Sequence, residues 1–171
     1  IRPAWTTLVN AAQRTLVSEF EHRSQQANDL IAENDVTFNV FQDGATSQRP
    51  WQLDLLPFVV GADEWRTIEA GLIQRARLLD RIVKDCHGPM RLIHDRVIPP
   101  EVLFANSGFW RPFCGLHQDE PSIVAAGFEL ARDQTGQWHV MADRAEAPAG
   151  AAFALENRIV TSRTIPAAFQ E

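Results

Sequence analysis

The stretch from Glu129 to Gly150, ELARDQTGQWHVMADRAEAPAG, is the most informative part of the sequence. An apolar run from Ile123 leads into it, and Asp133 to Gly136 has the composition of a tight turn. Apolar and polar residues alternate after that turn. Two such segments joined by a short turn are typical of a β-hairpin. The sequence therefore predicts antiparallel strands near residues 123–142.

Two carboxylates of this hairpin form a candidate metal site. Glu129 and Asp143 lie at nearly equal distances from the turn, so we expect them on paired strands with their side chains on one face. Mg²⁺ takes one or two protein carboxylates and otherwise keeps water or phosphate oxygens. The loop with Pro148 and Gly150 would let the backbone approach a ligand closely. The alternative is a plain surface hairpin whose charges are solvated.

Helices and shorter elements surround the hairpin. Apolar residues recur at spacings of three and four from Ala62 to Cys86, and Gly88–Pro89 then ends the predicted helix. The same period predicts a helix over 3–33, and residues 153–165 begin another. The other predicted elements are strands at 36–41 and 90–93, a loop at 46–49, an extended segment at 50–60 and a short helix at 100–104. Helices and hairpins without regular βαβ alternation indicate an α+β fold with a long central helix.

Composition excludes several classes of protein. The 171 residues are 45% hydrophobic and 22% charged, which is typical of a globular chain. A net charge of −6 argues against nucleic-acid partners and against a basic membrane-binding patch. No apolar run approaches the roughly 20 residues of a membrane span. Cys86 and Cys114 suggest reduced thiols, hence a cytoplasmic protein, and the first residue, Ile1, is expected not to be the native start.

Motifs of other enzyme classes are missing from the sequence. The five histidines show neither HxxxH spacing nor a zinc pattern with cysteine. The sequence also contains no Walker loop, no GxGxxG and no GxSxG elbow. P-loop and serine-hydrolase functions therefore have no support.

Several motifs occur in the order found in a known family. Residues 143–158, DRAEAPAGAAFALENR, resemble the pattern D-R-x-x-A-P-S-G-x-x-Y-x-L-E-N-R of the circularly permuted ATP-grasp proteins of type 2. Residues 49–57, RPWQLDLLP, are similar to a tryptophan-containing strand of the same proteins, and Gln74–Arg75 recurs in them. The resemblance covers residues 36–171, with residues 1–35 as an N-terminal helical extension.

The resemblance implies a partial ATP-grasp domain. Such proteins activate a carboxylate with ATP as an acyl phosphate, with Mg²⁺, and then join it to an amine. The family's nucleotide-binding lobe follows the LENR string, so we expect this chain to be the N-terminal portion of a longer ligase and inert alone. Its implied partners are ATP, a carboxylate substrate, an amine acceptor and the remaining lobe of the parent protein.

The resemblance also implies roles for individual residues. The metal-binding candidates are Glu129, Asp143 and Glu156, the cofactor-binding candidates are Pro148, Gly150 and Asn157, and the catalytic candidates are Arg144, Arg158 and Arg163. Arg75 is expected to hydrogen bond toward the 50–57 segment, where Asp54 would either be its partner or cap a turn.

Departures from the family pattern keep other readings open. Ala142 lies where the second-strand carboxylate is expected, and Asp143 lies one position further. A shift of one residue turns a strand side chain to the opposite face, unless a bulge intervenes. The alternative function is a degenerate, non-catalytic module that serves as a scaffold or protein-interaction domain. A third reading is an unrelated α+β domain.

Overall fold

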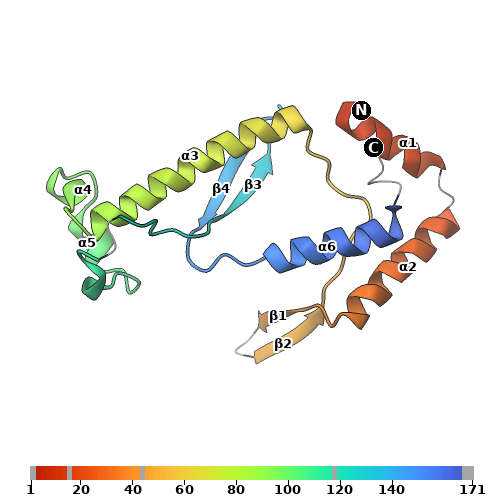
Figure 1. Ribbon diagram of the computed structural model, residues 1–171, viewed down its shortest axis with the longest axis horizontal. Helices are drawn as coiled ribbons and strands as arrows, with labels where there is room; N and C mark the ends of the chain where they lie inside the picture. The colour runs from red at the N-terminus through yellow and green to blue at the C-terminus, as the bar shows by residue number, and fades with distance from the viewer. Residues whose placement is uncertain (1–2, 15–16, 43–44, 117–118, 167–171) are drawn as a thin grey trace. The chain divides into compact units, whose positions relative to one another are not determined.

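The computed structural model describes residues 3–14, 17–42, 45–116 and 119–166. The chain divides into two compact units. We call Ile1–Gly61 together with Ala149–Glu171 the terminal unit, and Ala62–Pro148 the central unit. Both units combine helices with an antiparallel strand pair, so the predicted α+β class is confirmed (Figure 1).

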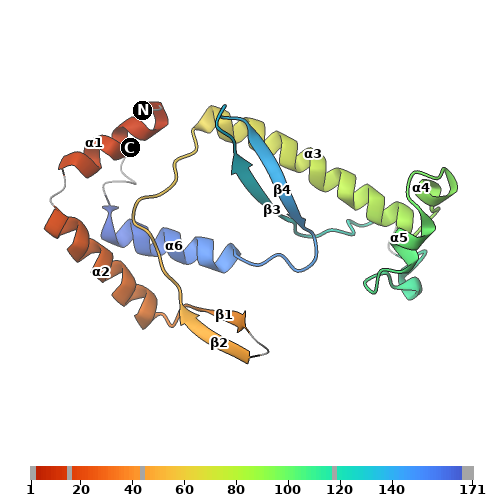
Figure 2. The same cartoon turned by 180° about the vertical axis from the view of Figure 1, so that it is seen from behind.

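The terminal unit contains α1 (Pro3–Arg14), α2 (Val17–Glu33), β1 (Thr37–Gln42), β2 (Ala45–Pro50) and α6 (Ala151–Thr164). Helices α2 and α6 lie side by side in both views (Figures 1 and 2). Their contact encloses an apolar core made of Ala27, Ile31, Leu55 and Val160. The extended segment after β2 supplies Leu55, so this segment joins the helices in one core.

The central unit contains α3 (Ala62–Cys86), α4 (Arg91–His94), α5 (Pro100–Phe104), a 3₁₀ turn (Arg111–Phe113), β3 (Gly127–Arg132) and β4 (Trp138–Arg144). The bounds of α3 agree with the prediction. The β3–β4 hairpin follows α3 in both views, which places its turn near the N-terminal half of the helix (Figures 1 and 2). Among the described residues of this unit, Ile68 and Cys86 alone are buried.

Three local predictions were wrong. The pattern over 3–33 gives two helices rather than one, and residues 15–16 between them lie outside the described ranges. Residues 46–49 belong to β2 rather than to a loop. Their side chains are polar because all four are exposed on a two-stranded ribbon, so they lack the alternation that marks a half-buried strand.

The third wrong prediction is the strand at 90–93, which is instead the helix α4. Met90 takes a left-handed conformation with φ 53° and turns the chain after α3. The carboxylate of Asp85 then accepts the backbone N–H groups of Arg91 at 3.1 Å and Leu92 at 2.9 Å. These bonds satisfy donors that the start of a helix leaves unpaired, and the local sequence pattern does not reveal them.

No helix of the described residues is long and apolar enough to cross a membrane.

Candidate functional site

A β-bulge decides which way the hairpin's charged side chains point. Phe128 pairs with Asp143 and Glu129 pairs with Ala142, but the register then shifts so that Leu130 pairs with Val140. The shift leaves one extra residue on β4. In a strand without a bulge, side chains alternate between the two faces, so Val140 and Asp143, three positions apart, would lie on opposite faces. Directly paired residues share a face of the sheet. Asp143 therefore shares a face with Val140, and Glu129 lies on the opposite face.

Asp143 binds a guanidinium from α3. Arg75 donates two hydrogen bonds to it, from Nε to Oδ1 at 2.6 Å and from Nη2 to Oδ2 at 2.8 Å. This two-pronged geometry is the strong form of an arginine–carboxylate contact. Hydrogen bonding within the pair lowers the pKa of Asp143 and raises the pKa of Arg75. The pair thus holds β4 against α3 with both carboxylate oxygens occupied.

Glu129 has an arginine partner of its own. Arg144 donates to Glu129 Oε1 from Nε at 2.9 Å and from Nη2 at 2.5 Å. Both side chains are exposed on the face of the hairpin that does not carry Asp143. The expectation that Glu129 and Asp143 share one face is therefore not met.

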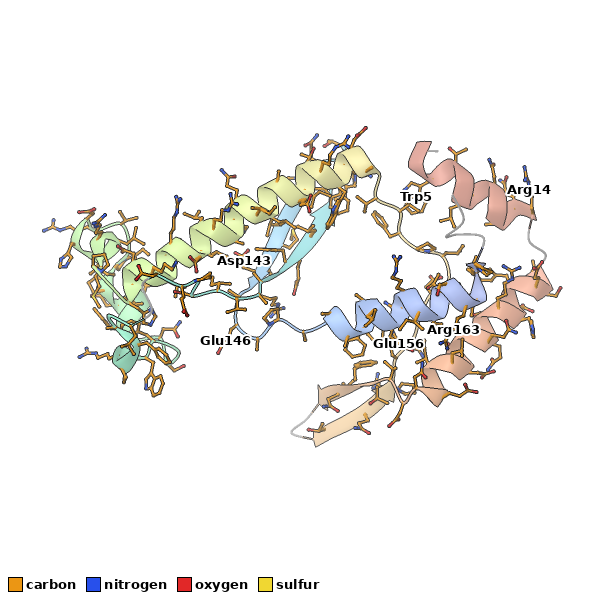
Figure 3. The ribbon with its side chains drawn as sticks, viewed as in Figure 1. Trp5, Arg14, Asp143, Glu146, Glu156 and Arg163 are labelled. Carbon is orange, nitrogen blue, oxygen red and sulfur yellow. The ribbon has the colours of Figure 1, made fainter. Side chains whose placement is uncertain are left out.

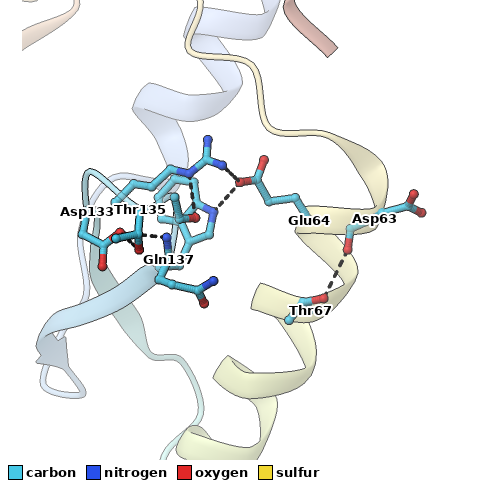
Figure 4. Close-up of polar contacts among 9 residues, drawn as sticks. Asp63, Glu64, Thr67, Asp133, Thr135 and Gln137 are labelled. Atoms are coloured by element: carbon cyan, nitrogen blue, oxygen red, sulfur yellow. Dashed lines mark hydrogen bonds and ion pairs between the residues drawn. The ribbon is translucent and has the colours of Figure 1, made fainter. Parts of the chain in front are cut away.

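A second polar cluster ties the hairpin turn to the start of α3 (Figure 4). Glu64 Oε1 accepts the indole Nε1–H of Trp138 at 2.8 Å and pairs with Arg132 Nη2 at 2.9 Å. The Nε–H of Arg132 donates to the carbonyl of Gly136 at 2.9 Å. Its buried Nη1 has no partner among the described residues. This cluster and the Arg75–Asp143 pair fix the hairpin along α3 at two levels.

Hydrogen bonds within the turn hold its shape. The carboxylate of Asp133 accepts from the Thr135 hydroxyl at 2.7 Å, from the Gln137 backbone at 2.9 Å and lies 2.8 Å from His139 Nε2. These hydrogen bonds, that of Thr135 first, lower the pKa of Asp133. Gly136 supplies the positive φ, 93°, that closes the turn.

An open groove of about 880 Å³ runs along α3 beside the hairpin. We call it the α3–hairpin groove. Its lining comes from α3 between Glu64 and Arg81 and from the hairpin residues Leu130 and 136–140.

The polar residues of the LENR string are bound within the terminal unit. Glu156 Oε1 accepts from Asn34 Nδ2 at 2.5 Å, and Asn157 Oδ1 accepts from the indole of Trp51 at 2.7 Å. The Trp51 ring also packs on Phe153, with ring centroids 4.5 Å apart. Glu156 and Asn157 thereby attach α6 to the segments that follow α2 and β2. Figure 3 shows Glu156 and Arg163 on α6, and the side chains of Arg158 and Arg163 are exposed.

The loop between the units contains the other candidates. Gly150 precedes α6 with a φ of 116°, and a Cβ there would meet nothing within 4 Å. In the central unit, a Cβ on Gly127 would lie 3.4 Å from Cβ of Pro148, so Pro148 packs beside the start of β3.

The arrangement does not fit a magnesium centre. The described residues include no group of three His, Cys, Asp or Glu side chains that could hold a metal ion. Glu129 and Asp143 point to opposite faces and are each neutralised by an arginine. Mg²⁺ needs carboxylate oxygens that are free to enter its coordination shell.

Sequence reasoning missed two partners. It placed Arg75 against residues 50–57, but both hydrogen bonds found for Arg75 go to Asp143, and Asp54 caps a turn by accepting the N–H of Leu56 at 2.9 Å. It gave Trp51 no contact with Asn157, 106 positions away. Both Arg75 and Trp51 lie in the motifs that carry the family resemblance, which was the available signal.

Comparison with known proteins supports that resemblance. The chain is 32% identical over 180 residues to the uncharacterized protein Rv2567 of Mycobacterium tuberculosis, and the match covers 100% of this chain and 20% of that protein. It is 35% identical over 138 residues to the uncharacterized protein sll0335 of Synechocystis, covering 79% of this chain and 28% of the relative. An uncharacterized protein of Mycobacterium leprae, ML0605, is 30% identical over 153 residues, covering 89% and 27%. The chain thus spans between a fifth and three tenths of the length of these relatives.

The sequence model of one family matches most of the chain. It covers residues 57–171 and is described as circularly permuted ATP-grasp type 2. The matched range includes α3, the β3–β4 hairpin, the loop after it and α6. The chain therefore belongs to the circularly permuted ATP-grasp family of type 2.

Proposed function

We propose that this chain is part of a longer ATP-dependent ligase that joins a carboxylate to an amine through an acyl phosphate. The observation that carries the proposal is the family match over residues 57–171, which includes the DRAEAPAG and LENR strings. These strings form the end of β4, the following loop and α6 in the structure. ATP and Mg²⁺ are the cofactors that ATP-grasp proteins generally use.

In this proposal the chain supplies structure on the substrate side and is inactive alone. Transition-state stabilisation in phosphoryl transfer needs cations positioned around the phosphates. The described carboxylates of the hairpin are bound to arginines, so we derive no step through a metal from them. Arg158 and Arg163 are both exposed on α6. We assign to Arg158 and Arg163 the binding of an anionic substrate group.

The test uses the parent protein with Mg²⁺ and ATP, and measures ADP release while amino acids and small amines are added. The variants are Arg158→Gln and Arg163→Gln, at the two residues assigned to the anionic group. Arg66→Gln is the matched control, because Arg66 is an exposed arginine on α3 outside the candidate set. Substrate-stimulated ADP release that falls at least about tenfold in the variants, but not in the control, supports the proposal. Absence of stimulated turnover together with absence of nucleotide binding overturns it.

A second candidate function is a non-catalytic interaction module. The observation that favours it is the bulged hairpin, in which Glu129 and Asp143 face opposite ways and each binds an arginine. Such pairs are structural contacts rather than free metal ligands. Isothermal titration of the parent protein with Mg²⁺ and ADP separates the two functions. A module of this kind binds neither, and its Asp143→Asn variant loses stability without losing any activity.

A further inference from the structure

Residues 49–52, which belong to the RPWQLDLLP string, line a pocket that the proposed ligase chemistry does not use. The pocket has a volume of about 290 Å³ and is lined by Phe38, Arg49, Pro50, Trp51 and Gln52. We call it the Arg49 pocket. All of its lining residues belong to the terminal unit. Apolar walls with a few polar side chains are the usual composition of a small-ligand site, and this volume suits a ligand with a single ring.

Strand pairing brings three of these side chains to one face of the β1–β2 ribbon. Phe38 and Arg49 are direct partners in the antiparallel pair, and directly paired residues share a face. The backbone N–H of Trp51 donates to the carbonyl of Val36 at 2.9 Å, so the pairing continues for another two residues. Residues two positions apart point the same way along an extended strand. Phe38, Arg49 and Trp51 therefore lie on one face, and the Phe38 and Trp51 rings meet edge to face with centroids 6.0 Å apart.

Contacts with α6 and with the core hold the Trp51 ring in place. Its indole N–H donates to Asn157 Oδ1 at 2.7 Å, and its ring packs on Phe153 with centroids 4.5 Å apart. Trp51 also packs against the apolar core of the terminal unit. A ring that is already fixed loses little conformational freedom when a ligand packs on it, which favours binding.

The guanidinium of Arg49 has no protein partner. Among the residues that the structure describes, it takes part in no hydrogen bond and no ion pair. Arg75 and Arg144, by contrast, are each bound to a carboxylate of the hairpin. A guanidinium presents parallel N–H groups that match the two oxygens of a carboxylate. Arg49 is therefore free to bind such a group from a ligand.

The charge of the pocket suits a carboxylate. Arg49 is the one ionisable residue in its lining, so the pocket offers a single positive charge. A phosphate monoester carries nearly two negative charges and is usually bound by a cluster of arginines. A second hollow on the same segment, of about 550 Å³, has Asp54 in its lining, which would repel an anion. We therefore expect an anionic ligand in the Arg49 pocket rather than in that hollow.

We propose that the Arg49 pocket binds a small aromatic carboxylate. Arg49 would donate two hydrogen bonds to the carboxylate, and the ring of the ligand would pack against Phe38 and Trp51. This binding needs neither ATP nor Mg²⁺, so it does not depend on the ligase activity proposed above.

Proton–nitrogen NMR of the ¹⁵N-labelled 171-residue chain tests the proposal. The chain has five tryptophans, and the indole signal of Trp51 is identified by its loss in Trp51→Phe. Phenylacetate is the probe, and the controls are phenylacetamide, which has the ring without the charge, and acetate, which has the charge without the ring. We expect phenylacetate to shift the Trp51 signal saturably, with a Kd of about 1 mM or below, and to leave the other indole signals in place. Each control should bind at least about fivefold more weakly.

Variants of the chain separate the charge from the aromatic surface. Arg49→Gln should weaken phenylacetate binding at least about fivefold and leave phenylacetamide binding unchanged. Arg49→Lys keeps the charge but loses the two-pronged donor, so its affinity should lie between those of Arg49→Gln and the unmodified chain. Phe38→Leu removes one ring and should weaken the binding of both compounds.

Arg14→Gln is the matched control, because Arg14 is an exposed arginine of the terminal unit that does not line the pocket. Unchanged indole signals of the other tryptophans show that each variant remains folded. Three results would overturn the proposal. Phenylacetate fails to shift the Trp51 signal saturably, or phenylacetamide or acetate binds as tightly as phenylacetate. Arg14→Gln weakens binding as much as Arg49→Gln, which would show attraction by the overall charge rather than a site at Arg49.

Discussion

The terminal unit is built around buried apolar side chains, whereas the central unit joins its helix to its hairpin through charged and hydrogen-bonded side chains. In the terminal unit Ala27, Ile31, Leu55 and Val160 form one core. In the central unit the hairpin is attached to α3 by the Arg75–Asp143 pair and by the contacts of Glu64.

This difference shows which substitutions each unit tolerates. The free energy gained by burying apolar side chains is close to proportional to the area removed from water. The free energy of unfolding therefore falls strongly when methyl groups are removed from a core. Each exposed ion pair contributes little to the free energy of unfolding. Bidentate pairs with good geometry nevertheless fix one register and one orientation of the two elements that they join. The central unit therefore owes its arrangement to a few specific contacts.

The largest expected effect comes from replacing a buried isoleucine by alanine, in one variant for each unit. Ile31→Ala should cost about 3–4 kcal/mol, because Ile31 is 1% exposed and tightly surrounded. Ile68→Ala should cost about 2 kcal/mol or less, because Ile68 borders the open groove, where the surroundings can relax. Regional hydrogen exchange, read on α2 and α3 separately, measures both losses. Val17→Ala, at a side chain exposed in α2, is the control. Equal losses at the two isoleucines would contradict the comparison.

Glu64→Gln should loosen the central unit and leave the terminal unit unchanged. The variant removes the charge that faces Arg132, whose side chain is only 18% exposed, and a hydrogen bond to a charged group contributes about 1.5–3 kcal/mol. Faster exchange of amides in β3 and β4 is the expected readout. Glu69→Gln, an exposed carboxylate on the same helix, should change nothing. If the amides of β3 and β4 exchange no faster in Glu64→Gln, the contacts of Glu64 do not hold the hairpin against α3.

Sequence patterns predicted the elements better than the contacts. The apolar period located α3 to the residue, and the turn composition located the hairpin. The bulge on β4 could not be read from the sequence, because any of several residues could be the extra one. The extra residue at the bulge places Asp143 on the face opposite to the predicted one. Asp143 therefore contacts Arg75 and does not lie beside Glu129. Contacts between distant residues such as Trp51 and Asn157 depend on how α6 packs, which no local pattern records.

A double-mutant cycle on Trp51 and Asn157 tests whether specific polar contacts also matter in the apolar unit. Trp51→Phe retains a ring near Phe153 but removes the indole donor. With Asn157→Ala as the second change, the coupling free energy should be about 1 kcal/mol, the usual net value of one hydrogen bond. Urea denaturation of the four proteins gives it. A coupling near zero would mean that Asn157 contributes only packing.

The smallest expected effect is the acid sensitivity of the hairpin. Asp143 and Asp133 both have a pKa below that of an ordinary aspartate, Asp143 chiefly through its hydrogen bonds from Arg75 and Asp133 through those from Thr135 and His139. A carboxyl whose pKa is lower in the folded state binds protons more readily when unfolded. Its stabilisation is therefore present above the unfolded pKa of about 4 and is lost as pH falls through the folded pKa.

Hydrogen exchange of β3 and β4 should consequently accelerate, relative to the intrinsic rate, as pH falls below about 4. Asp143→Asn should remove part of that dependence, and the remainder should belong to Asp133. The control is Asp95→Asn, at an exposed aspartate after α4. The terminal unit, whose core is apolar, should lose less protection over the same range. An equal acid response in both units would show that the ionic contacts of the central unit do not determine its stability, and the contrast between the units would then rest on the buried core alone.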